Sequence, residues 1–174
     1  MKSTGEVMGI DREFGIAFAK AAMGAGLRLP KNGRVFVSVK DADKRAILPV
    51  ARNLVDLGFQ LVATEGTYDA LRSAGIDCDR VNKVHEGRPN VLDLLANRDI
   101  ELVINTPHGS APRADDTRIR ARAVQLGVPV ITTLSGAQAV VSGIGALKRK
   151  NYEVVALQDW MTAHRSSEGI AARA

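Results

Sequence analysis

Short apolar runs alternate with helical stretches from residue 34 onward. The runs are rich in valine, leucine and isoleucine and predict strands at residues 34–39, 59–63, 80–84, 101–105 and 128–132, and the pattern allows a last short strand at 154–157. The stretches between them predict helices at residues 41–57, 67–73, 90–96, 115–126 and 135–147. Strands that alternate with helices in this way are typical of a parallel sheet covered on both faces.

The first part of the chain does not follow this alternation. Residues 1–10 are polar and show no period, whereas residues 12–26 place apolar side chains on one face and end in glycines, which predicts a helix. A helix that precedes the first strand looks like an appendage to the main core. Farther along, Pro49 lies late for a first helical turn, so the 41–57 helix either starts nearer Leu48 or is kinked.

Composition narrows the function classes. The 174 residues fit one domain with a short appendage, and 45% of them are hydrophobic, enough for a real core. The net charge of +5 is compatible with nucleic acid or phosphorylated metabolites, but 4% aromatic residues argue against a stacking platform for nucleic acid. No apolar stretch is long enough to cross a bilayer. The single cysteine, Cys78, excludes an internal disulfide, fits a reducing cytoplasm and is interpreted as structural.

The segment after the second predicted strand carries the clearest candidate chemistry. It runs Thr64-Glu65-Gly66-Thr67 directly into a helix, so free backbone N–H groups and the positive end of the helix dipole favour an anion there. Gly66 permits a tight turn close to a ligand, and Lys44 and Lys83 could each add a positive charge. Asn105 follows the fourth strand and could read a base, a ribose or a carboxylate. Taken singly, each residue has an ordinary structural role as a cap, a turn or a solvated lysine.

Signals for catalysis are weaker. Asp115 and Asp116 could form an acid–base pair, but the start of a helix also favours two acidic residues without any catalytic role. The three histidines, His85, His108 and His164, lack metal-ligand spacing, so no metal site is predicted.

Four segments together resemble a known family. Residues 1–9 (MKSTGEVMG) resemble the segment that closes the second ATP-grasp unit of the carbamoyl phosphate synthetase large subunit. Residues 63–67, 83–89 and 104–106 resemble that subunit's carboxy-terminal allosteric domain, in the same order. The resemblance implies a methylglyoxal-synthase-like fold: a Rossmann-like five-stranded parallel sheet with helices on both faces, preceded by an N-terminal helix.

The same resemblance implies a division of the chain and a binding site. Residues 1–31 would be the end of the preceding ATP-grasp unit, residues 32–164 the allosteric domain and residues 165–174 a flexible tail. Bacterial members bind nucleotide monophosphates, with UMP inhibiting and IMP activating. The implied effector-binding set is Lys44, Thr64, Thr67, Lys83 and Asn105, with Gly66, His85, Asp115 and Ile119 lining the same pocket. Members that respond to N-acetylglutamate carry a tryptophan at the position of Lys83, so the lysine favours a phosphate effector.

The family also implies a larger context. The whole enzyme would join bicarbonate, glutamine-derived ammonia and two ATP, with Mg or Mn, into carbamoyl phosphate for arginine and pyrimidine synthesis. This fragment would be non-catalytic and without a cofactor. Its partners would be a nucleotide effector, the rest of the large subunit and the glutaminase small subunit, in a cytoplasmic oligomer without nucleic acid or membrane.

Departures from the family pattern keep two alternatives open. Pro107 replaces a second threonine of the nucleotide-binding pattern, and Val130 stands where ornithine-responsive members have a tyrosine, although Thr132 is retained. One alternative is a methylglyoxal synthase, whose carboxylate base lies in a Gly-Asp-Gln element that reads Arg88-Pro89-Asn90 here. The synthase histidine appears as Arg113 in this chain, although Asp116 has a counterpart in the synthases. The other alternative is a structural or oligomerisation module with a vestigial pocket.

Overall fold

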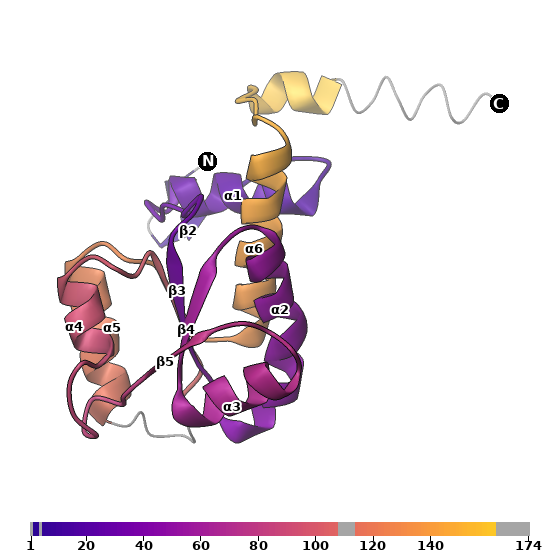
Figure 1. Cartoon of the computed structure of the whole chain (residues 1–174). Coiled ribbons are helices and arrows are strands. Elements are labelled where there is room, and N and C mark those ends of the chain that lie inside the picture. Colours follow the sequence, from indigo (N-terminus) through magenta and orange to yellow (C-terminus); the bar gives the residue numbers. More distant parts are fainter. Residues whose placement is uncertain (1, 4, 108–113, 163–174) are drawn as a thin grey trace.

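A five-stranded parallel sheet forms the centre of the protein (Figure 1). The computed structural model describes residues 2–3, 5–107 and 114–162. The strands lie in the order β5-β4-β3-β6-β7, and every neighbouring pair is parallel. Their bounds are β3 (Arg34–Ser38), β4 (Gln60–Thr64), β5 (Asp79–Val81), β6 (Leu102–Asn105) and β7 (Val130–Ile131). This arrangement confirms the predicted fold class.

Helices cover both faces of the sheet, so the strands are apolar on both sides. The helices are α2 (Lys44–Asp56), α3 (Glu65–Ser73), α4 (Val91–Ala96), α5 (Ala114–Gln125) and α6 (Leu134–Arg149). On β3, Val35 and Val37 point to the face packed by α2, α3 and α6, whereas Phe36 points to the face packed by α4 and α5. Figure 1 shows α4 and α5 on one side of the strands and α2 and α6 on the other.

Helix α1 (Phe14–Gly24) packs against α6 outside these two layers. Ile16 of α1 is fully buried. A Cβ added to Gly15 would stand 2.6 Å from the backbone oxygen of Ser142, so a glycine is required for this close approach of the two helices. Helix α1 is thus packed closely against α6, while the assignment of residues 1–31 to a separate unit stays a prediction.

Helix α2 begins earlier than one interpretation of its proline suggested. A short 3₁₀ turn (Asp41–Asp43) leads into α2, which starts at Lys44 and contains Pro49 in its interior. A start near Leu48 is therefore wrong. Burial of Ile47 on the apolar face holds this first turn against the sheet, and that packing offsets the backbone hydrogen bond that proline removes.

Both ends of the described chain differ from the pattern-based expectation. Two-residue strands β1 (Lys2–Ser3) and β2 (Glu6–Val7) form an antiparallel hairpin that the polar N-terminal sequence did not predict. The strand allowed at residues 154–157 is wrong, since residues 151–156 have no regular structure and residues 157–162 are helical. This run follows α6 on the side away from the five-stranded sheet (Figure 1). Among the described helices, none combines the length and apolar character needed to cross a membrane.

Candidate functional site

A polar cleft of about 450 Å³ lies at the carboxyl ends of the strands. We call it the polar cleft and define it by the residues around it that follow β3, β4 and β5 and begin α5. Of the nine residues proposed for the site, eight line the cleft: Lys44, Thr64, Gly66, Thr67, Lys83, His85, Asp115 and Ile119. The structure thus brings together five residues that the strand-end argument proposed and three that only the resemblance implied, namely His85, Asp115 and Ile119.

The topology of the sheet explains where the cleft forms. The chain moves outward from β3 to β4 and β5, and then returns to the other side of β3 with β6 and β7. Connections therefore diverge between β3 and β6, and in open α/β sheets such a divergence leaves a crevice beyond the strand ends. Ser38 at the end of β3 and Thr64 at the end of β4 face each other here, with their hydroxyl oxygens 3.1 Å apart.

The start of helix α3 offers donors to the cleft. Thr64 occupies the N-cap position in an extended conformation, yet its hydroxyl bonds to Ser38 and makes no capping hydrogen bond to the helix. Thr67 is only 2% exposed, and its hydroxyl oxygen accepts the Val39 N–H at 3.1 Å, which leaves its own hydrogen for another acceptor. The first turn of α3 thus combines the uncapped amides and positive dipole end that suit an anion.

Lys44 points at this helix start. A Cβ added to Gly66 would stand 2.8 Å from the Lys44 ammonium nitrogen, so the ammonium group lies directly over the glycine. Gly66 is therefore needed for the close approach of a side chain from α2 to the backbone of α3. The ammonium nitrogen and the helix dipole act on the same small volume of the cleft.

Each lysine of the cleft has a carboxylate partner three residues away. Lys44 pairs with Asp41 at 2.8 Å, and Lys83 pairs with Glu86 at 3.0 Å. The pKa of Glu86 is lowered, first because its carboxylate accepts the Lys83 backbone N–H and next because it accepts from the Lys83 ammonium group. These pairs are partly solvated, so an anion of higher charge can compete for either ammonium group.

His85 and Asp115 form a second type of pair. The His85 Nδ1 lies 2.7 Å from the Asp115 Oδ2, and the direction of the hydrogen bond depends on the imidazole tautomer. The two residues come from separate elements, the loop after β5 and the first turn of α5. The contact joins two walls of the polar cleft and fixes the direction of the imidazole.

Asn105 lies behind the cleft wall instead of lining it. Its side-chain amide is buried and donates to the Asp116 Oδ1 at 3.0 Å. Asp116 itself lines the cleft, and among the described residues its other oxygen, Oδ2, has no hydrogen-bond partner although it is buried. The sequence suggests Asp116 as a helix-start or acid–base residue and as the counterpart of a synthase residue. It does not place Asp116 in the effector-binding set, because nothing in the sequence tells which of two adjacent aspartates is buried.

The segment that replaces the synthase element is used for local structure. Asn90 caps α4: its side-chain oxygen accepts the Leu92 N–H at 3.0 Å, and its amide donates to the Gly87 carbonyl at 2.9 Å. Arg88 pairs with Asp93 of the same capping box. The polar atoms of this segment therefore hold the loop and helix together.

Other candidate groups lie apart from the cleft. Burial raises the pKa of the Cys78 thiol to about 11, so the thiol stays protonated near neutral pH and is a poor nucleophile. His108, Arg113, His164 and the proposed tail at residues 165–174 lie outside the described residues. Within the described ranges, no group of three potential metal ligands gathers.

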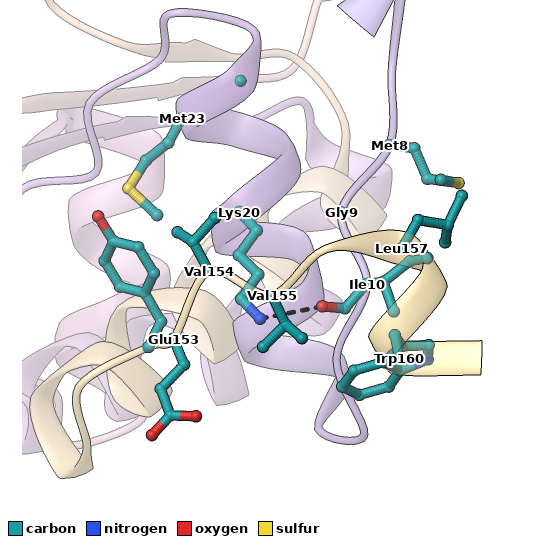
Figure 2. Close-up of a pocket in the computed structure, with 12 residues that line it drawn as sticks. Met8, Gly9, Ile10, Lys20, Met23, Glu153, Val154, Val155, Leu157 and Trp160 are labelled. Carbon is teal, nitrogen blue, oxygen red and sulfur yellow. Dashed lines mark hydrogen bonds between the residues drawn. The ribbon is translucent and has the colours of Figure 1, made fainter. Parts of the chain in front are cut away.

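A second cavity of about 520 Å³, which we call the apolar cavity, lies between helix α1 and the C-terminal segment. Figure 2 shows its lining side chains, which are mainly apolar: Met8, Ile10, Met23, Val154, Val155, Leu157 and Trp160. The Lys20 ammonium group at its wall donates to the Ile10 carbonyl at 3.0 Å and to the Asp11 carboxylate at 2.8 Å. The charge of Lys20 is thus already compensated, and the cavity offers apolar surface.

The fold and the polar cleft define a class of protein: a parallel α/β domain with an anion-receptive crevice where its strand order diverges. A family model described as "MGS-like domain" matches residues 46–132. The methylglyoxal synthase from Elizabethkingia anophelis NUHP1 superimposes with a TM-score of 0.55 over 72% of this chain and 97% of the synthase, at 18% identity, which supports the fold alone. The chain belongs to the MGS-like domain family.

Closer relatives carry a more specific name. The carbamoyl phosphate synthase large chain of Acidobacterium capsulatum is 52% identical over 158 residues, which is 91% of this chain and 14% of the relative. The C-terminal section of the same large chain in Aquifex aeolicus is 50% identical over 153 residues, covering 88% of this chain and 28% of the relative. The chain therefore spans between about one seventh and three tenths of the length of such curated relatives.

Proposed function

We propose that this chain is the regulatory domain of a carbamoyl phosphate synthase large chain and that its polar cleft binds a nucleotide monophosphate such as UMP or IMP. The observation that carries the proposal is the Lys44 ammonium group lying over Gly66 at the uncapped start of α3. That arrangement supplies a positive charge, backbone donors and a hydroxyl within one small volume, which is the set of groups that a phosphate recognises.

The remainder of the cleft suits the rest of a nucleotide. Its volume of about 450 Å³ falls within the roughly 300–1,000 Å³ usual for small-molecule sites. Lys83 enters from the loop after β5, and the half-buried Val84 beside it adds apolar surface against which a base can pack. Polar groups at one end and apolar side chains beside them match a molecule with a charged head and a flat body.

Regulation would follow from coupling between this domain and the rest of the large chain. An effector that binds one arrangement of the two more tightly shifts the equilibrium toward it, typically by about 1–3 kcal/mol. In this proposal residues 1–31 end the preceding ATP-grasp unit, and the apolar cavity faces protein instead of a metabolite. ATP with Mg or Mn, the glutaminase subunit and carbamoyl phosphate synthesis belong to the remainder of the enzyme.

The methylglyoxal synthase alternative is weaker because the segment that carries its carboxylate base has no aspartate here. Proton abstraction next to a carbonyl needs a positioned carboxylate base. The segment that carries the base in the synthases places Asn90 here, and its side chain is occupied by the capping box of α4. We therefore favour ligand binding over lyase chemistry for this fragment.

Calorimetric titration with UMP and IMP tests the proposal. We expect saturable binding, and we expect Lys83→Ala to weaken it by about 1–3 kcal/mol, since a charge-assisted hydrogen bond is lost. The control is Lys31→Ala, which removes an exposed lysine outside the polar cleft and should leave affinity unchanged. Absence of saturable binding at millimolar nucleotide would contradict the proposal, as would equal affinities for the wild type and Lys83→Ala. Release of methylglyoxal from dihydroxyacetone phosphate at enzyme-like rates would favour the synthase instead.

A further inference from the structure

The geometry points to Thr106 as a positioning residue of the polar cleft, which holds the chain after β3 so that the Lys44 ammonium group lies over Gly66. This inference rests on the proposed function, because it concerns the point at which the phosphate is expected to bind. Thr106 does not line the cleft itself, so its effect on a ligand is indirect. The inference brings a residue from the β6 side of the sheet into the support of the phosphate site.

Thr106 binds the chain after β3 through two hydrogen bonds. Its backbone N–H donates to the Ser38 carbonyl at 3.1 Å, and its side-chain hydroxyl oxygen accepts the Lys40 N–H at 3.1 Å. Thr106 is only 3% exposed, so water has little access to it. Ser38 and Asn105 are the last residue pair of the β3–β6 ladder. The Thr106 hydroxyl therefore extends the contact between the two strands beyond the end of the ladder.

The segment that Thr106 holds leads directly to Lys44. Lys40 precedes the 3₁₀ turn Asp41–Asp43, and its carbonyl oxygen accepts the Asp43 N–H at 2.9 Å. That turn passes into α2, whose first residue is Lys44. The position of the Lys40 peptide group therefore helps to set where the Lys44 side chain starts. Its ammonium group has little freedom, since a Cβ on Gly66 would stand only 2.8 Å from the ammonium nitrogen.

Other hydroxyl groups hold the same segment from the β4 side. The Thr67 hydroxyl oxygen accepts the Val39 N–H at 3.1 Å, and the hydroxyl oxygens of Thr64 and Ser38 lie 3.1 Å apart. Thr64 and Thr67 line the cleft and are expected to contact the ligand, so their substitution would remove a ligand contact and segment support together. Thr106 supports the segment from outside the cleft lining, so its substitution separates the two roles.

Loss of the Thr106 hydroxyl would leave the Lys40 N–H without this acceptor. A backbone N–H withdrawn from water is unfavourable without a partner, so the segment would shift toward another acceptor. Such a shift would move the Lys44 ammonium group away from the start of α3, where a charge-assisted bond to phosphate depends on distance and direction. The consequence is weaker UMP binding, although no group that touches UMP has been removed.

The test compares substitutions at two threonines of the whole chain. Thr106→Val keeps the shape of the side chain and removes its hydroxyl, whereas Thr106→Ser keeps the hydroxyl. The matched control is Thr133→Val: the Thr133 hydroxyl also accepts a backbone N–H, from Gly136 at 3.1 Å, but it caps α6 outside the polar cleft. Calorimetric titration measures UMP affinity, and thermal melting verifies that each variant is folded.

We expect Thr106→Val to weaken UMP binding by about fivefold, as for partial loss of one charge-assisted hydrogen bond. Thr106→Ser should bind within about twofold of the wild type, because its hydroxyl can still accept the Lys40 N–H. Thr133→Val should lower the melting temperature through loss of its cap and keep the wild-type affinity. The inference is overturned if Thr106→Val binds UMP as tightly as the wild type does, or if Thr133→Val or Thr106→Ser weakens binding as much as Thr106→Val.

An NMR measurement on the protein without nucleotide tests the route through Lys44. Lys44→Met removes the ammonium group over Gly66 and should therefore shift the Gly66 amide resonance. Thr106→Val should shift that resonance in the same direction, and Thr133→Val should leave it in place. A Gly66 resonance that keeps its wild-type position in Thr106→Val overturns the inference even if binding weakens.

Failure of the inference is distinguishable from failure of the proposed function. If the wild type binds UMP and Thr106→Val binds it equally well, the inference alone fails. If the wild type binds neither UMP nor IMP, both fail. Thr106→Ala replaces Thr106→Val if the valine variant does not fold.

Discussion

The polar cleft and the apolar cavity are hollows of similar size, but they are built from different parts of the chain. The cleft is formed by residues at the ends of strands and on the helices that follow them, so regular backbone positions its polar groups. The cavity is formed by segments before and after the sheet, and apolar side chains dominate it. The difference indicates that the cleft suits a small charged ligand, and that the cavity's surroundings serve packing between segments.

Substitution of Ile16 in α1 should have the largest effect: it should lower stability without changing ligand binding at the polar cleft. The side chain is fully buried on α1, so Ile16→Ala should lower the free energy of unfolding by about 2–5 kcal/mol. UMP affinity at the polar cleft should stay unchanged. Urea unfolding and calorimetry measure the two quantities. Phe14→Ala on the same helix is the control, because Phe14 is 65% exposed and its loss should change stability by less than about 0.5 kcal/mol.

Substitution of Gly66 should have the opposite effect: it should weaken ligand binding and leave stability nearly unchanged. A new Cβ would displace the Lys44 ammonium group from the start of α3, so Gly66→Ala should weaken UMP binding by about tenfold. Stability should be unchanged or slightly higher, since alanine is favoured over glycine within a helix by about 0.5–1 kcal/mol. Ser73→Ala, at the last and exposed position of α3, is the control for a change in helix propensity. Unchanged affinity for Gly66→Ala would break the assignment of the phosphate to this point.

The ion pair at the wall of the apolar cavity gives a smaller, pH-dependent effect. The pKa of Asp11 is lowered, chiefly by the hydrogen bond from Lys20, so the folded state favours the ionised carboxylate. The stabilisation is therefore present above the ordinary Asp11 value of 3.8 and is lost as the pH falls through the lowered value.

Asp11→Asn should lower the free energy of unfolding by about 0.5–1 kcal/mol at pH 7, and the difference from the wild type should vanish in strong acid. Urea unfolding at pH 7 and below pH 3.8 measures it. Asp56→Asn, at an exposed aspartate of α2, provides the comparison. A difference that persists unchanged into acid would argue that the Lys20–Asp11 pair does not stabilise the fold.

The sheet and the contents of the polar cleft could be predicted because both depend on local pattern. Buried parallel strands are apolar on both faces, and the residues that follow them must meet at one edge. The short hairpin β1–β2 could not be predicted, since two-residue strands carry no period. The strand expected at residues 154–157 failed because an apolar run can equally cover a cavity wall, as Val155 and Leu157 do.

Within the site, the sequence did not show how deeply each residue is buried. Asn105 was expected at the cleft on the strength of its place after a strand, but Asp116 of the following helix covers it. The unpartnered oxygen of Asp116 depends on the packing of α5 against the sheet, and no sequence pattern records that packing. A buried oxygen without a partner can be identified only from the hydrogen bonds of the folded structure.

The carboxylates that flank Lys44 and Lys83 also decide how an anion would enter. Neither ammonium group is without a partner: Lys44 pairs with Asp41 and Lys83 pairs with Glu86, and either carboxylate can rotate toward water. Occupancy of the cleft is therefore a displacement, in which a phosphate oxygen takes the position of a side-chain oxygen and few counter-ions are set free. An anion must therefore outcompete a side-chain carboxylate at either lysine, which favours a doubly charged phosphate over a singly charged carboxylate ligand.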